Sequence, residues 1–230
     1  MGRATDIEAP HQGVRAGYAL AAPAYEQWHW FRFWRENEAP LVRGWAQLLR
    51  PGLVLDAGSG TGVYRPDLEK AGHRVVAADL SLDMLKVQTQ RYSESRAVAA
   101  DLRLLPFGPQ SIDHILCARV LSHIAEPELV LTEFVRVAKR DSQFLLCDVH
   151  PEHRYSDMSI PVNGKKVSIK TYKHDLREIR RNAASLPLEL LRLQEYHLKD
   201  LSWKPPREGF ENIYDQPERP IFYICQLRKR

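Results

Sequence analysis

One segment of the chain, Val54-Leu55-Asp56-Ala57-Gly58-Ser59-Gly60-Thr61-Gly62, constrains the possible folds more than any other. An apolar run typical of a buried strand leads into a glycine at every second position. Glycine permits a sharp turn at positive φ and leaves space for a ligand to lie against the backbone. The segment therefore predicts a strand, a ligand-binding turn and a helix. The alternative is the same tight turn with no ligand.

The spacing of the glycines narrows the choice of ligand. In the nicotinamide fingerprint the third glycine comes three positions after the second, whereas Gly62 comes two after Gly60. This spacing favours a nucleoside ligand without a pyrophosphate. A nicotinamide-dependent reductase would also usually carry a Tyr-x-x-x-Lys pair, and the sequence has none.

Two carboxylates end the next two predicted strands. Asp79 follows Arg74–Ala78, where its carboxylate can accept hydrogen bonds from both hydroxyls of a ribose. Asp101 follows Arg96–Ala100, where it can accept from the exocyclic amine of an adenine while the N–H of Leu102 meets a ring nitrogen. The carboxyl ends of parallel strands share one edge of a sheet, so we expect a single adenosine-binding cleft there. A charge at a helix N-terminus or on the surface is the plainer interpretation of Asp79.

Short strands alternate with helices through most of the chain. The predicted strands are Leu53–Ala57, Arg74–Ala78, Arg96–Ala100, Ile112–Cys117, Gln143–Cys147, Leu191–Leu198 and Ile221–Leu227. Helices are predicted up to about Lys70, from Ser81 to about Tyr92, over Glu128–Ala138 and over 173–185, and Asn163-Gly164 predicts a hairpin between Met158–Val162 and Lys165–Ile169. This order predicts an α/β fold with a Rossmann-like, seven-stranded, mostly parallel sheet and helices on both faces.

The N-terminal segment is expected to cap this sheet. Residues 1–17 have no clear periodicity and predict an irregular, mobile start, whereas apolar spacings of three and four between Tyr25 and Leu49 predict one or two helices interrupted near Pro40. We expect one structural domain overall. In it, 1–49 is a helical cap, 50–230 is the ligand-binding domain, and 151–186 is an insertion after the fifth strand that shapes the acceptor site.

Composition and charge exclude several classes of protein. The chain is 44% hydrophobic with a net charge of +4, as expected for an ordinary globular domain with no nucleic-acid arm. Cys117, Cys147 and Cys225 are an odd number inside apolar runs without metal-ligand spacing, which predicts neither a disulfide framework nor a metal site. No leader or membrane-spanning run is evident, so a cytoplasmic location is expected.

Together these motifs resemble the class I S-adenosylmethionine-dependent methyltransferases, and most of all the branch of ubiquinone/menaquinone-type and other small-molecule methyltransferases. The similarity covers roughly residues 50–150. Its motifs are Asp56 to Gly62, Asp79-Leu80-Ser81 with Met84, Ala100-Asp101, Leu105-Pro106-Phe107, Ser111-Ile112-Asp113, Val120-Leu121-Ser122-His123 and Glu133-Phe134-Val135-Arg136-Val137. One departure is Lys139-Arg140-Asp141-Ser142, where the family usually has a Pro-Gly-Gly turn.

The resemblance implies S-adenosyl-L-methionine as the cofactor. The methionine part would face Gly58 and Gly60, the ribose Asp79, and the adenine Asp101 and Leu102, with Asp56 orienting the glycine loop. The full set of implied cofactor residues is Tyr18, Tyr25, Asp56, Gly58, Ser59, Gly60, Asp79, Leu80, Met84, Asp101, Leu102 and Ala118. No metal is implied.

A small-molecule acceptor is favoured by the absence of other signatures. The Asn/Asp-Pro-Pro-Tyr/Phe motif of amino-methylating enzymes is missing after the fourth strand, where Cys117-Ala118-Arg119-Val120 stands. Methylation at O, N or C remains open, and an RNA- or protein-directed enzyme and a non-catalytic cofactor-binding protein are the alternatives. His123 and Tyr172 are the candidate catalytic bases, although a hydrogen-bonded structural residue is the plainer interpretation of His123.

Overall fold

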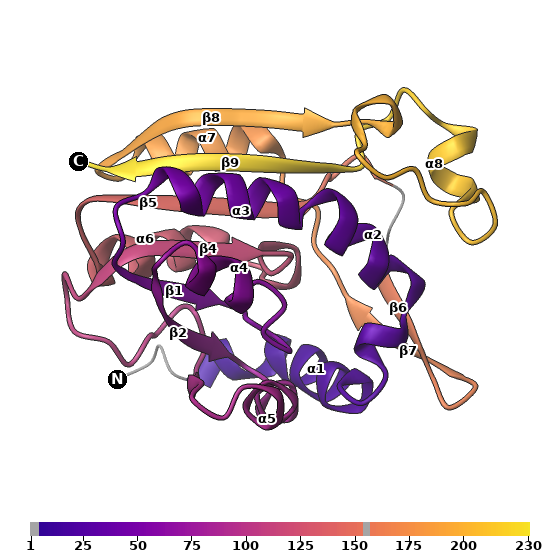
Figure 1. The fold of residues 1–230 in the computed structure, drawn as a ribbon, viewed down its shortest axis with the longest axis horizontal. Coiled ribbons are helices and arrows are strands. Elements are labelled where there is room, and N and C mark those ends of the chain that lie inside the picture. The colour runs from indigo at the N-terminus through magenta and orange to yellow at the C-terminus, as the bar shows by residue number, and fades with distance from the viewer. Residues whose placement is uncertain (1–4, 154–156) are drawn as a thin grey trace.

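The computed structural model describes residues 5–153 and 157–230, and its centre is a seven-stranded sheet in the order β3-β2-β1-β4-β5-β9-β8 (Figure 1). The strands are β1 (Leu53–Ala57), β2 (Arg74–Asp79), β3 (Arg96–Ala99), β4 (Ile112–Ala118), β5 (Ala138–Val149), β8 (Leu188–Tyr196) and β9 (Phe222–Lys229). Strands β1 to β5 pair in parallel, and β9 runs antiparallel to both β5 and β8. The predicted α/β class and mostly parallel sheet are confirmed.

Helices cover both faces of the sheet, because alternate residues of the strands are apolar on both sides. The helices are α1 (Thr5–Ala21), α2 (His29–Asn37), α3 (Ala39–Leu48), α4 (Arg65–Lys70), α5 (Leu82–Arg91), α6 (Pro127–Val137), α7 (Leu176–Ala184) and α8 (Glu211–Asp215), with 3-10 turns η1 (Tyr25–Gln27), η2 (Leu121–His123) and η3 (Leu198–Asp200). On β4, Leu116 packs in the core with α2 and α3, whereas Ile115 packs with α6 and α7 on the opposite face (Figure 1).

The N-terminal segment is more ordered than its sequence predicts. The expectation of an irregular start is wrong for residues 5–17, which belong to α1, while residues 1–4 lie outside the described residues. The helix lies against the hairpin of β6 (Asp157–Val162) and β7 (Lys165–Lys170) (Figure 1). A Cβ on Gly17 would lie 2.7 Å from Cγ1 of Ile169, so this glycine permits the close contact. The helix therefore makes a tertiary contact with the hairpin, and the periodicity of its own sequence does not indicate that contact.

The segment Lys139–Ser142 replaces the family's usual turn with strand. It lies inside β5, which begins at Ala138, and the register with β4 shifts between Ile112 and His114. Asp141 absorbs the irregularity with φ at 62°, a left-handed conformation that aspartate tolerates better than most residues. The sequence departure thus alters the connection at the amino end of β5, remote from the carboxyl edge of the sheet. Among the described residues, no helix is long and apolar enough to cross a membrane.

Candidate functional site

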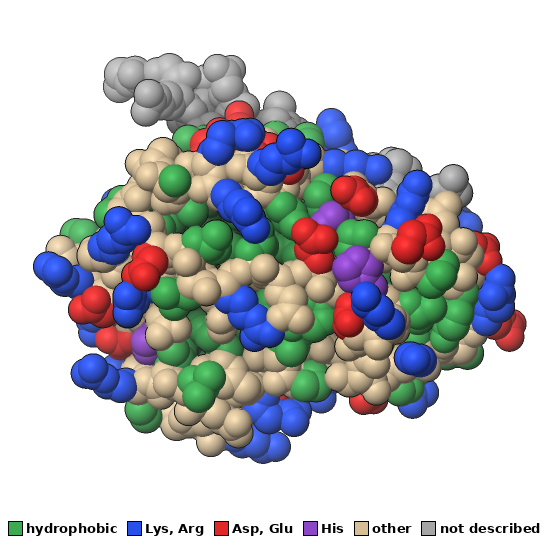
Figure 2. Space-filling model, turned by 90° about the horizontal axis from the view of Figure 1, so that it is seen from above, with side chains coloured by type: hydrophobic (Ala, Val, Ile, Leu, Met, Phe, Trp, Pro, Cys, Tyr) green, Lys and Arg blue, Asp and Glu red, His purple; other side chains and the backbone are tan. Residues whose placement is uncertain are grey.

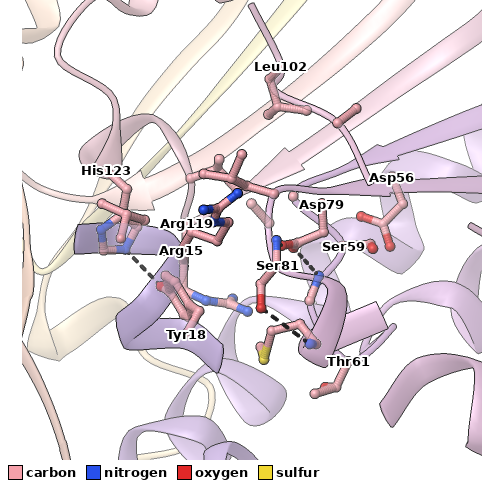
Figure 3. Close-up of a pocket in the computed structure, with 18 of the residues that line it drawn as sticks. Arg15, Tyr18, Asp56, Ser59, Thr61, Asp79, Ser81, Leu102, Arg119 and His123 are labelled. Carbon is pink, nitrogen blue, oxygen red and sulfur yellow. Dashed lines mark hydrogen bonds between the residues drawn. The ribbon is translucent and has the colours of Figure 1, made fainter. Parts of the chain in front are cut away.

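A pocket opens above the carboxyl ends of β1, β2 and β4, with α1 on its far side (Figure 3). We call it the strand-end pocket. All the residues that the sequence assigned to the cofactor line it, namely Tyr18, Tyr25, Asp56, Gly58, Ser59, Gly60, Asp79, Leu80, Met84, Asp101, Leu102 and Ala118. The topology explains this convergence, because parallel strands bring three separate sequence motifs to one edge of the sheet.

Two glycines of the turn, Gly58 and Gly60, are needed for different reasons. Gly58, Gly60 and Gly62 have φ of 73°, 54° and 77°, all in the left-handed region. A Cβ on Gly58 would lie 2.1 Å from Cγ2 of Val120, so the fold itself excludes a side chain there. A Cβ on Gly60 would meet only the flexible end of Met84, at 3.2 Å. Gly58 is therefore required by packing, whereas Gly60 faces the pocket.

Asp79 holds the glycine turn and the start of α5 together. One carboxylate oxygen accepts from the backbone N–H of Gly60 and the other from that of Ser81, both at 2.8 Å (Figure 3). Burial raises the pKa of Asp79, and these backbone donors oppose the shift. Ser81 in turn caps α5, accepting from the N–H of Met84 at 3.4 Å. The side chain that faces the ribose in the resembling family is thus already fixed by backbone groups.

Asp56 is buried beside Asp79 without compensation. It is 2% exposed, and its Oδ2 has no hydrogen-bond partner among the described residues. Burial, and then the charge of Asp79, raise the pKa of Asp56 to about 7, with Arg65 opposing. No hydrogen bond joins it to the described glycine turn, so the expected orienting role of Asp56 has no direct contact behind it.

Asp101 is oriented by a residue that the sequence did not single out. Its carboxylate accepts from the backbone N–H of Arg103 at 2.9 Å and from Nη2 of the same residue at 2.8 Å. The Arg103 side chain is only 2% exposed and also binds Glu126 at 3.0 Å. The spacing of two positions between Asp101 and Arg103 at the end of a strand could have suggested this pairing.

A second pocket adjoins the first and is built mainly of aromatic and histidine side chains; we call it the aromatic pocket. The N-terminal segment supplies Trp28, Trp30 and Trp34, and the chain after β5 supplies His150, His153, Met158 and Tyr172. Trp34 lines this pocket as well as the core, whereas Trp45 lies in the core alone.

Four residues line both pockets: Tyr18, Tyr25, Arg119 and His123, which we call the shared wall. The Tyr18 hydroxyl lies 2.8 Å from Nε2 of His123 (Figure 3), and Nδ1 of His123 lies 3.0 Å from the carbonyl oxygen of Lys170. A carbonyl can only accept, so in the neutral ring Nδ1 carries the proton and Nε2 accepts from Tyr18. Burial lowers the pKa of His123 and raises that of Tyr18. Both groups are consequently neutral near pH 7, and His123 has the form of a base.

Tyr172, the other candidate base, shares the aromatic pocket with His123 but forms no hydrogen bond with it among the described residues. It lines the aromatic pocket and not the strand-end pocket, and its backbone N–H donates to the Ser122 carbonyl at 2.6 Å. Its ring is stacked 6.3 Å from that of His174, whose Nε2 is tied to the Ile124 carbonyl at 2.8 Å. The two bases predicted from sequence are therefore not adjacent partners in one hydrogen bond.

The sequence missed Arg119, which follows β4 directly. It has φ of 59°, and its Nη1 contacts both the buried carboxylate of Glu38 and the Tyr64 hydroxyl. Neither the left-handed backbone nor a partner 81 positions away leaves a local sequence signal. Within residues 5–153 and 157–230, no three His, Cys, Asp or Glu side chains gather as a metal site would require.

Comparisons with known proteins agree with this geometry. A family model described as "Methyltransferase domain" matches residues 55–146. A demethylmenaquinone methyltransferase of Streptomyces griseus is 32% identical over 155 residues, covering 64% of this chain and 65% of that protein. Another, of Renibacterium salmoninarum, is 36% identical over 99 residues, covering 43% of this chain and 42% of that protein. The alignments thus span less than two thirds of these relatives.

Solved structures share the fold at low sequence identity. An S-adenosylmethionine-dependent methyltransferase of Mesorhizobium loti matches with a TM-score of 0.66 at 14% identity, over 83% of this chain and 98% of that chain. A magnesium protoporphyrin IX methyltransferase from Synechocystis, solved with bound S-adenosylmethionine, matches with a TM-score of 0.59 at 18% identity, over 84% of this chain and 78% of that chain.

Proposed function

We propose that this chain, which belongs to the class I S-adenosylmethionine-dependent methyltransferases, transfers the methyl group of S-adenosyl-L-methionine to an O, N or C nucleophile of a small-molecule acceptor. The observation that carries this proposal is the pair of adjoining pockets with a shared wall. Methyl transfer needs two ligands in contact, with the nucleophile about 3 Å from the methyl carbon and in line with sulfur. Two separate clefts would not allow that arrangement.

The strand-end pocket would hold the cofactor. Asp101 and Leu102 would receive the adenine, Asp79 the ribose hydroxyls, and the turn at Gly58 and Gly60 the methionine part. Each Asp79 oxygen already accepts one backbone N–H and retains capacity for another donor. Ser59, Leu80, Met84 and Ala118 would complete the floor and sides, with Tyr18 and Tyr25 as the cover. The cofactor supplies a methyl group already activated by the sulfonium charge, so the protein's task is mainly positioning.

His123 is the better placed of the two proposed bases. It faces both pockets, its Nε2 lone pair is directed at Tyr18, and a proton arriving there would form an imidazolium. The Lys170 carbonyl and the nearby charge of Asp148 favour that charged form. A hydroxyl or amine acceptor could pass its proton to Nε2 directly or through the Tyr18 hydroxyl. Tyr172 also lines the aromatic pocket and is proposed as a second group near the acceptor.

The aromatic pocket would hold the acceptor, between the N-terminal cap (1–49) and the insertion (151–186), which both frame the domain at 50–230. Three tryptophans and uncharged histidines suit a flat, largely apolar molecule. The names of the relatives give a quinone and a porphyrin as substrates of those proteins. A quinone-type or other planar small molecule is therefore the acceptor class that we propose.

Calorimetry would test the cofactor assignment, and mass spectrometry the reaction. We expect S-adenosylmethionine and S-adenosylhomocysteine to bind and NADH not to bind. Incubation with isotopically labelled S-adenosylmethionine and pooled metabolites should then label one planar small molecule by a single methyl group. Binding of NADH alone would overturn the cofactor assignment, and the absence of any labelled product would favour a non-catalytic binding protein.

An RNA- or protein-directed enzyme is the second candidate. Figure 2 shows one face of the molecule, on which Lys and Arg side chains are scattered among acidic and apolar ones rather than gathered over one element. The face in this view therefore offers little to a phosphate backbone. Labelling of total RNA or of protein in the same experiment, with no labelled metabolite, would support this candidate instead.

A further inference from the structure

Arg119 has donor groups that the protein does not use. Its Nη1 contacts Glu38 and the Tyr64 hydroxyl, whereas neither Nε nor Nη2 has a hydrogen-bond partner within residues 5–153 and 157–230. These two nitrogens form the edge of the guanidinium on which two N–H bonds point in parallel. That edge matches the two oxygens of a carboxylate.

The guanidinium is also held rigidly. Its Cζ lies over the rings of Trp34 and Tyr64, 5.3 Å and 5.5 Å from the two ring centroids. The backbone of Arg119 is left-handed, at φ of 59°, and its N–H donates to the Cys147 carbonyl at 2.7 Å. A non-glycine residue kept in this conformation marks a position where the surrounding structure overrides local preference, and such residues cluster at ligand sites.

The charges around Arg119 leave room for one more anion. Glu38 is completely buried and balances the guanidinium, yet its own Oε1 has no partner among the described residues. Among the side chains that the structure describes, no Asp or Glu lines the aromatic pocket, where Arg119 and Lys173 supply positive charge. Buried charged groups are normally fully hydrogen-bonded, so a guanidinium edge that has no partner among the described residues and lies beside two pockets calls for a ligand.

We propose that Arg119 is a carboxylate-binding residue in the shared wall, with Nε and Nη2 each donating to one oxygen of the same carboxylate. That carboxylate comes either from the methionine end of the cofactor or from an acidic acceptor, because Arg119 lines both pockets. The inference rests on the proposed function, in which these pockets hold the two ligands. It adds the chemical group that the site selects and the residue that selects it.

Two pairs of probes separate the sources by calorimetry. S-adenosylhomocysteine carries the methionine carboxylate, and 5′-methylthioadenosine is the same thioether nucleoside without it. The planar acid 2-naphthoate and its neutral amide 2-naphthamide test the aromatic pocket. Removing Arg119 alone would leave Glu38 buried and unpaired, so the test protein is the double variant Arg119→Gln/Glu38→Gln. Glu38→Gln is its matched control, because it keeps the guanidinium.

Loss of about 10-fold or more in affinity for S-adenosylhomocysteine, with 5′-methylthioadenosine within about 2-fold of wild type, would assign the cofactor carboxylate. The same contrast between naphthoate and naphthamide would assign an acceptor carboxylate. Equal effects on acid and neutral probes, or no effect on either, would overturn the proposal. If the double variant does not fold, Arg119→Lys decides in the same way, because it keeps the charge but loses the paired donors. A wild-type protein that binds neither nucleoside would instead contradict the proposed function.

Discussion

The two pockets of this molecule adjoin each other but are constructed by opposite means. The strand-end pocket is assembled from short segments at the ends of neighbouring strands, and backbone N–H groups fix its carboxylates. The aromatic pocket is assembled from side chains of the cap, the turn after β4 and the insertion. The first arrangement follows from the sheet itself, whereas the second depends on distant segments meeting. The part of the site that any acceptor would meet is therefore the part that sequence motifs describe least.

The largest expected effect comes from removing residues 1–24. This deletion takes away α1 and Tyr18, and so opens the shared wall. We expect kcat to fall to below about 1% of wild type, because water enters and the acceptor loses its alignment. Binding of S-adenosylhomocysteine should persist in a folded core, as circular dichroism and calorimetry would show. Normal turnover by the truncated protein would mean that the cap does not close the acceptor site.

We expect His123→Gln to lower kcat about 100-fold for an acceptor whose nucleophile loses a proton on methylation. Because burial lowers the pKa of His123 below 6.5, the wild-type rate should hold at neutral pH and fall only under more acidic conditions. The acidic decline should be absent in the variant. Tyr172→Phe is the matched comparison. A pH profile identical in His123→Gln and wild type would remove the base from the shared wall.

At alkaline pH, the Asp56→Asn variant should be more stable than the wild-type protein. The folded protein raises the pKa of Asp56 from 3.8 to about 7, so the native state binds more protons than the unfolded chain between these values. Stability should consequently fall as pH rises through this window. Ionising such a carboxyl in the fold costs about 4 kcal/mol at pH 9. Urea unfolding at pH 4 and pH 9 should show a gain for the variant at pH 9 alone, and an equal gain at both would contradict the assignment.

Gly58→Ala should destabilise the fold by about 2–4 kcal/mol, because its Cβ would clash with Val120 at a positive φ. Gly44→Ala is the control: it lies within α3 with nothing within 4 Å of the new Cβ, and should stabilise by about 0.5–1 kcal/mol. Thermal unfolding of both variants measures the contrast. If the two behaved alike, the close approach of Val120 would not be limiting.

Asp79→Asn keeps the shape of the side chain but loses its charge. Affinity for 5′-methylthioadenosine should weaken by about 1.5–3 kcal/mol, the scale of a hydrogen bond to a charged group. The naphthamide probe of the aromatic pocket should be unaffected, which sharpens the distinction between the pockets. An unchanged nucleoside affinity would show that the ribose lies elsewhere.

Local signals were sufficient for the sheet and for the carboxylates that line the strand-end pocket. The strand at Leu53–Ala57 was predicted to the residue, because a buried parallel strand followed by glycines has few alternatives. Asp79 and Asp101 were found for the same reason. Strand β8 was displaced by about three residues at its start, since a register irregularity between Leu190 and Arg192 interrupts the apolar alternation on which the prediction relied.

Longer-range features left no such signal. Helix α1 was missed because its contact with the hairpin depends on Gly17, which reads locally as a helix breaker. Arg119 was missed because its importance comes from Glu38, Tyr64 and Trp34, which reach it only in the folded chain. Burial of Asp56 was evident from its strand, but its lack of a hydrogen-bond partner was not.

The shared wall also has a thermodynamic consequence. Tyr18, Tyr25, Arg119 and His123 belong to both pockets, so a ligand that repositions any of them changes the surface offered to the other ligand. The binding free energies are then not additive. Whatever factor S-adenosylhomocysteine imposes on the affinity for naphthamide, naphthamide must impose on the affinity for S-adenosylhomocysteine. Because α1 rests on the β6–β7 hairpin through Gly17 and Ile169, a ligand that displaces this helix would disturb the hairpin as well, and the linkage between the two ligands would extend to both elements.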